Sequence, residues 1–221
     1  MKKIAVAVLS LGLLGALPSA QAAAVSVDAG TFTFTYDDSF LAGSSFSSAG
    51  GLFTFSGLSY GAAALGGVVD QASSAGTFDG YFGKPAPILI TPKAGYQITG
   101  VTESISGRYM ATAGADQGSM AGAAGSAISY WVYQDGVTPV GQHVVSQTGF
   151  VFAGDAQVGG SYSASGSLNF LPVIAAEHLA PGSIMLSFAD LRATALAIGA
   201  GSGAVATLNQ YQIGVQIGRA H

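Results

Sequence analysis

The sequence predicts an all-β protein, an antiparallel, jelly-roll-like β-sandwich of about ten strands with one or two short helices. Short segments alternate apolar and polar residues with a period of two, as half-buried strands do. Gly, Pro or Ser flanks these segments, and the 221 residues include 33 glycines. Regular helical spacing is scarce. Two sheets that bury their apolar faces against each other are therefore the economical arrangement.

The expected strands follow one another along the chain. The first, at 31–36, places Phe32, Phe34 and Tyr36 on one face and threonines on the other. The others are expected at 52–56, 87–91 continuing into 94–109, 129–133, 140–145, 150–152, 161–170, 183–198 and 205–217. Alanine-rich segments at 62–69, 120–128 and 172–179 are the candidates for short helices.

Two local signals refine this pattern. In the segment 96–105, the inward-facing positions change phase at Thr99-Gly100, which predicts a β-bulge at Gly100. Asp135-Gly136 is a pair favoured by a two-residue hairpin turn, so the strand that ends at Tyr133 should turn back there.

The first 22 residues have the three parts of a secretory signal peptide. Lys2 and Lys3 precede an apolar run at 4–17, and Ala20-Gln21-Ala22 follows as the cleavage site. The apolar run is shorter than the roughly 20 residues that cross a bilayer. We therefore expect removal of 1–22 and a single β-sandwich domain over 23–221, without a transmembrane helix. We also expect a secreted protein, extracellular or at the cell surface, with the periplasm left open.

Charge and cysteine content exclude several classes of protein. Without the signal peptide, five basic residues face 11 acidic ones, a formal charge of −6. The basic residues are scattered, so a nucleic-acid partner is not expected. Cysteine is absent, so the fold depends on its core alone. Because charged residues make up only 8% of the chain, strand edges carry little protection and self-association is a further expectation.

Two segments carry a family resemblance. The first is Gly-Tyr-Gln-Ile-Thr-Gly-Val-Thr-Glu-Ser-Ile-Ser-Gly-Arg-Tyr at 95–109, and the second is 185–195 with the alternating strand 205–215. They resemble strands of PEP-CTERM-type exoproteins from exopolysaccharide-producing Gram-negative bacteria. Gly107-Arg108-Tyr109 stands where such proteins often have Gly-Asp-Tyr, and the sorting tail of that group does not follow Arg219-Ala-His221. The resemblance implies an envelope or matrix setting and no established catalysis.

Glu103 is an acid on the apolar face of its strand, between Val101 and Ile105. An unpaired carboxylate there would cost several kcal/mol of desolvation. We therefore expect a structural role in a hydrogen bond or ion pair. Arg108 is the nearest cation, although it lies on the opposite face of an unbroken strand and would need the turn at Gly107 to reach Glu103.

Two sets of residues are candidates for partner binding. Trp131 and Tyr133 share one strand face and Tyr130 the other, so these rings either pack in the core or stack on sugars. In a fibre, the segment 25–36 would leave its own domain and complete a neighbour's sheet. Its donor-strand residues would be Val25, Val27, Phe32, Phe34 and Tyr36.

Motifs that suggest catalysis or cofactor binding lack the neighbouring strands and helices that such sites require. Ser59 stands in a Gly-x-Ser-x-Gly pattern, but the strand and helix alternation of an α/β-hydrolase is missing. The glycines at 199–203 are followed by a strand instead of a dinucleotide-binding helix. His143, His178 and His221 lack zinc spacing, and the aspartates read as turn residues. No enzyme activity, cofactor or metal is expected, although a structural Ca²⁺ among the loop aspartates stays open.

The sequence therefore supports three hypotheses in order. The first is a non-enzymatic envelope or matrix protein that acts in adhesion or exopolysaccharide association. The second is a self-assembling, pilus-like fibre subunit that uses donor-strand exchange. The third is an outer-membrane β-barrel, which suits Gly-rich alternation but not charge-poor strands.

Overall fold

The computed structural model describes residues 23–79 and 86–220. The expected signal peptide, Lys84 and His221 lie outside these residues. Twelve strands and one short helix are present in the described part: β1 (Ala24–Asp28), β2 (Phe32–Asp37), β3 (Ser45–Ala49), β4 (Leu52–Leu65), β5 (Val69–Asp79), β6 (Ile88–Pro92), β7 (Tyr96–Thr112), β8 (Met120–Tyr133), β9 (Pro139–Phe152), β10 (Val158–Asn169), α1 (Leu171–Ala176), β11 (Ile184–Ile198) and β12 (Gly203–Arg219).

The strands form two antiparallel sheets that pack face to face, which confirms the predicted all-β sandwich. The first sheet has the order β1-β2-β6-β11-β8-β9, and β5 pairs with the second part of β11. The second sheet has the order β10-β7-β12-β4-β3. Side chains from both sheets fill the space between them. No helix among the described residues is long and apolar enough to cross a membrane.

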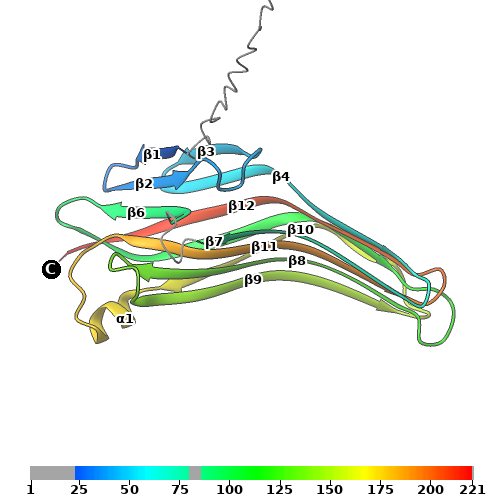
Figure 1. Ribbon diagram of the computed structural model, residues 1–221. Coiled ribbons are helices and arrows are strands. Elements are labelled where there is room, and N and C mark those ends of the chain that lie inside the picture. Colours follow the sequence, from blue (N-terminus) through cyan, green and yellow to red (C-terminus); the bar gives the residue numbers. More distant parts are fainter. Residues whose placement is uncertain (1–22, 80–85, 221) are drawn as a thin grey trace, which may run out of the picture.

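The sandwich has a wide end and a narrow end (Figure 1). The wide end holds β1, β2, β3, β6 and α1, and large side chains such as Phe34, Phe53, Trp131 and Phe170 fill its core. Phe34 and Phe53 stack with their ring centroids 3.8 Å apart across the two sheets. This end therefore holds most of the apolar burial that stabilises the fold.

Alanines form the core of the narrow end. Its buried cluster consists of ten alanines and one valine: Ala62, Ala64, Ala111, Ala121, Ala123, Val151, Ala193, Ala195, Ala197, Ala204 and Ala206. Side chains this small fill the interior only if the sheets approach more closely than the roughly 10 Å of an ordinary sandwich. Figure 1 shows the long strands converging toward this end.

Two of the three candidates for short helices are strands for this reason. The segments 62–69 and 120–128 belong to β4, β5 and β8, and only the third candidate is helical, as α1. Alanine favours helices in isolation, but tertiary packing overrides a propensity of this size. Alternate alanines of these strands face the opposite sheet, and that contact decides the structure.

The predicted bulge near Gly100 and the predicted turn at Asp135-Gly136 are both present, although the turn is longer than expected. Gly100 pairs with Gln216 and Ile98 with Ile217, so Thr99 is an extra residue and the predicted bulge is confirmed. The turn at Asp135-Gly136 is also present, but five residues separate β8 from β9 instead of two. Asp135 shapes this loop by accepting hydrogen bonds from the backbone N–H groups of Val137 and Thr138, both at 2.9 Å.

Candidate functional site

The outer face of the second sheet carries two rows of uncharged polar side chains. Each row crosses all five strands, in the order β10, β7, β12, β4 and β3. The first row is Ser163, Ser106, Gln210, Ser56 and Ser45, and the second is Ser165, Ser104, Gln212, Thr54 and Ser47. We call these residues the hydroxyl-amide rows. On β4, β7 and β12 they alternate with buried residues, so the core fixes which face they occupy.

Side-chain hydrogen bonds hold the middle of the rows in place. The hydroxyl of Ser106 donates to Oε1 of Gln210 and that of Ser104 to Oε1 of Gln212, each at 3.0 Å. Nε2 of Gln212 in turn donates to Oγ1 of Thr54 at 3.0 Å. Such cross-strand bonds fix rotamers, so the polar groups are arranged before any ligand arrives.

The rows can offer hydrogen bonds outward because each group has capacity beyond these contacts. A hydroxyl both donates and accepts, and a side-chain amide has two donor hydrogens. A shallow hollow of about 50 Å³ opens among Ser104, Ser106, Ser163, Gln210 and Gln212. The rows contain no carboxylate and no cation. This surface therefore suits a neutral ligand rich in hydroxyl groups.

Glu103 lies directly beneath this face, at 1% exposure in the core. Its Oε2 accepts hydrogen bonds from the Ser129 hydroxyl at 2.5 Å and from Nδ1 of His143 at 2.8 Å, and its Oε1 accepts one from the Tyr211 hydroxyl. Glu103 and Tyr211 belong to the second sheet, whereas Ser129 and His143 belong to the first. The carboxyl group therefore joins the two layers through their interior.

Glycine makes room for this cluster. Gly166 of β10 pairs with Glu103, and a Cβ at Gly166 would lie 2.3 Å from Nε2 of His143. The imidazole of His143 fills the space that a side chain would take. Burial, and next the charge of Glu103, raises the pKa of Tyr211 well above its ordinary value, so its hydroxyl stays protonated and donates.

The geometry of this cluster indicates a structural role and not a catalytic one. A serine nucleophile needs its hydroxyl on the histidine base, but the Ser129 hydroxyl donates to Glu103 instead. Ser129 also accepts a hydrogen bond from Nε1 of Trp131 at 3.3 Å and is 1% exposed. The expected partner Arg108 is not in the cluster, because it lies on the opposite face of β7 and is exposed.

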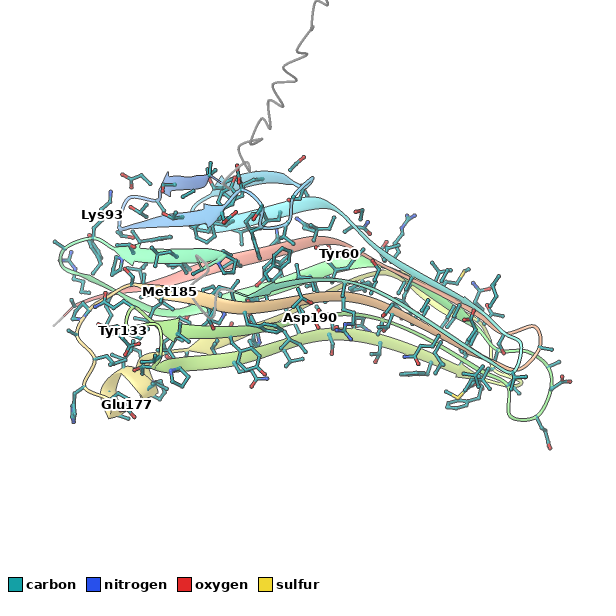
Figure 2. All side chains as sticks on the ribbon, in the orientation of Figure 1. Tyr60, Lys93, Tyr133, Glu177, Met185 and Asp190 are labelled. Carbon is teal, nitrogen blue, oxygen red and sulfur yellow. The ribbon has the colours of Figure 1, made fainter. Side chains whose placement is uncertain are left out.

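The aromatic residues proposed for ligand stacking lie mainly inside the protein. Trp131 is fully buried, so it presents no ring to a ligand and that interpretation is wrong for this residue. Tyr133 is also buried, and its hydroxyl donates to the carbonyl of Ala180 at the end that carries α1 (Figure 2). Tyr130 is 41% exposed on the outer face of the first sheet, against Phe188. It alone of the three stays available for stacking.

The proposed donor strand pairs within its own chain. The residues Val25 and Val27 belong to β1, and Phe32, Phe34 and Tyr36 to β2, which pairs with both β1 and β6. Phe32 and Phe34 are buried in the chain's own core. Release of this segment would therefore remove two core phenylalanines.

The remaining motifs are structural as well. Ser59 lies within β4 beside a bulge opposite Asn209, not at a turn into a helix, and Gly199 and Gly201 form the hairpin between β11 and β12 with positive φ. No cluster of three metal-ligating side chains occurs within 23–79 and 86–220. His178 follows α1 in a left-handed conformation, with a φ of 50°.

Sequence reasoning identified four of the five strands that carry the hydroxyl-amide rows, but it missed β3, whose Ser/Gly-rich segment reads as a flexible connection, and it missed the rows themselves. The signal was present in the alternation Ser161-Tyr-Ser-Ala-Ser-Gly-Ser167 and in Gln210-Tyr-Gln-Ile213. Such alternation shows which residues face outward. Only the register between strands shows that the outward residues of five separate segments align.

Comparisons with known proteins place the chain in no family. No family model and no curated protein matches it. A chain from the structure of the infectious bursal disease virus Gx strain is 15% identical, with a TM-score of 0.24 over 77% of this chain and 36% of that chain. This chain thus spans about a third of the length of that viral chain.

Two further solved structures are similarly distant. One comes from a study of promiscuous specificity in carbohydrate-binding modules of the β-sandwich superfamily, at 9% identity and a TM-score of 0.22 over 90% of this chain and 75% of that one. The other is a family 12 xyloglucanase from Bacillus licheniformis, at 12% identity and a TM-score of 0.21 over 88% of this chain and all of that one. TM-scores this low leave the function to be inferred from the chain's own side chains.

Proposed function

We propose that this protein is a secreted, non-enzymatic β-sandwich that associates with a neutral polysaccharide in the cell envelope or extracellular matrix. The hydroxyl-amide rows carry this proposal. They offer aligned donors and acceptors across five strands, which lie about 4.8 Å apart and so span about 19 Å. A glycan laid across the strands would meet a hydroxyl or amide group at each step.

Charge supports a neutral ligand over an acidic one. The chain beyond the expected signal peptide has a formal charge of −6. The cationic side chains of the described residues are few, and Lys93 and Arg192 are paired with Asp28 and Asp190 at 2.7 Å. An acidic polysaccharide would therefore be repelled over most of the surface.

Binding to a panel of polysaccharides tests the proposal. The mature chain should bind neutral glucans or galactans in affinity electrophoresis and not bind alginate, an acidic polymer. Exchange of both Gln210 and Gln212 for Ala should weaken binding about tenfold or more, because two preorganised amides are lost. The matched control is Gln142→Ala, an exposed glutamine on the first sheet. Equal binding by the row variant and the wild type would contradict the proposal.

Tyr130→Ala provides a second arm of the same experiment. If this variant loses binding while the row variant keeps it, the ligand lies on the first sheet and the rows are not the site. A fibre subunit is the less supported alternative, because its donor residues Phe32 and Phe34 are buried in their own domain. Electron microscopy of the mature chain separates the two functions, since only the fibre subunit would form filaments.

A further inference from the structure

An apolar groove lies on the outer face of the second sheet, toward the narrow end. Its volume is about 590 Å³, within the range of small-molecule sites. Residues of β7, β10 and β12 line it, among them Arg108, Met110, Gly160, Ser161, Val205 and Thr207. The groove is next to the hydroxyl-amide rows on the same strands, because Ser106 and Arg108 are successive outward residues of β7.

The wall of the groove is apolar although it faces solvent. Met110 and Val205 pair directly across β7 and β12, and they are 46% and 40% exposed. On the other side, β10 contributes Gly160 and Ser161, which add little bulk. Exposed apolar side chains are ordinary when they occur singly, but here two of them line one hollow.

Arg108 lies at the polar end of this groove. It pairs in register with Thr207 and Ser161, one step from Met110 and Val205 along the strands. The ion pairs of Lys and Arg side chains found among residues 23–79 and 86–220 involve Lys93 and Arg192, and none involves Arg108. A guanidinium without a carboxylate at the edge of an apolar groove complements a ligand with an anionic head and an apolar tail.

We propose that this groove binds an anionic single-chain amphiphile, such as a fatty carboxylate. The carboxylate pairs with the guanidinium of Arg108, where the Thr207 and Ser161 side chains add polar surface. The hydrocarbon chain covers Met110 and Val205. The proposal is independent of polysaccharide binding, because it uses none of the hydroxyl-amide residues.

Isothermal titration of the mature chain with dodecanoate, kept below its micelle concentration, tests this assignment. The expected result is saturable 1:1 binding that weakens tenfold or more in Arg108→Gln, with no change in the control Arg219→Gln, an exposed arginine at the other end of β12. Dodecyl maltoside, which has the same tail and a neutral head, should bind Arg108→Gln and the wild type equally. Val205→Ser should weaken both ligands. These residues are exposed, so the variants are expected to fold.

Three results would overturn the proposal. The first is the absence of saturable dodecanoate binding to the wild type. The second is equal dodecanoate affinity for Arg108→Gln and the wild type. The third is displacement of dodecanoate by acetate at similar concentration, which would show a simple anion site without a role for the apolar wall. Polysaccharide binding should be unchanged in Arg108→Gln, because the two proposed sites use different residues. A loss of dodecanoate binding in this variant therefore leaves the polysaccharide proposal intact.

Discussion

Removal of the Glu103 carboxyl group should destabilise the protein more than any other single polar change near the core. The variant Glu103→Leu keeps the site apolar but leaves three donors without their acceptor: the Tyr211 hydroxyl, the Ser129 hydroxyl and Nδ1 of His143. Each unsatisfied buried donor costs about 1–3 kcal/mol. The His143 side chain is 14% exposed and can find water, so the two fully buried hydroxyls set the expected total at about 2–6 kcal/mol.

The single tryptophan of the chain reports on this change. Trp131 donates to Ser129, which donates to Glu103, so its fluorescence follows the unfolding of the cluster in urea. Domains of this kind have a free energy of unfolding of about 5–15 kcal/mol, so Glu103→Leu should still fold but unfold at a much lower urea concentration. Ser104→Ala changes the neighbouring residue on the outer face and should cost only about 0.5–1.5 kcal/mol, the value of its single hydrogen bond to Gln212.

A double-mutant cycle separates the network from simple loss of packing. Tyr211→Phe alone should cost about 1–3 kcal/mol, because Oε1 of Glu103 loses its donor in the core. In the Glu103→Leu background the same change should cost far less, which gives a coupling energy of about 1–3 kcal/mol. Additive effects, or a Glu103→Leu variant within about 0.5 kcal/mol of the wild type, would refute the assignment of Glu103 as the acceptor that joins the sheets.

Three further changes probe the packing and the ionisation of the core. Gly166→Ala should push His143 from Glu103 and cost about 1–3 kcal/mol in urea unfolding, whereas Gly67→Ala, whose added Cβ would have no atom within 4 Å, should be nearly neutral. Ala195→Leu should overpack the narrow end and cost about 1–3 kcal/mol; an unchanged thermal midpoint would contradict the close approach of the sheets there. Burial raises the pKa of Tyr162 to about 12, so the fold favours its protonated form. Stability should therefore be intact below pH 10 and fall by up to about 2 kcal/mol between pH 10 and 12, and Tyr162→Phe should flatten that part of the pH profile.

The sequence was most informative where one strand determined its own structure. The alternation around Glu103 predicted both the bulge at Gly100 and the inward direction of the acid, and the structure has both. A period of two specifies which side chains face inward, and a glycine at a change of phase specifies a bulge. Neither inference needs knowledge of a neighbouring strand.

Prediction failed where a contact depended on strands far apart in sequence. Trp131 was a candidate for ligand stacking because its strand presents aromatic residues on both sides, and only the position of β8 inside the first sheet shows which side is the core. The alanine-rich segments were misassigned as helices for a similar reason. Their small side chains favour strands here only because they pack against the alanines of the other sheet, and that contact is not visible in the local sequence.

The partners of Glu103 show the same limit in one cluster. Arg108 is five residues away and carries the opposite charge, yet Tyr211, Ser129 and His143 are the residues that bind the carboxyl group, from 26 to 108 positions away. A buried acid takes the donors that its own sheet and the opposite sheet bring to it, here Tyr211 from its own sheet and Ser129 and His143 from the other. Nearness in sequence therefore does not decide the partner. Arg108 is left on the outer face, next to the hydroxyl-amide rows and at the edge of the apolar groove. The alternation of β7 thus keeps Arg108 apart from the buried Glu103 although the two are near in sequence, and it leaves the guanidinium on the face where the amphiphile is proposed to bind.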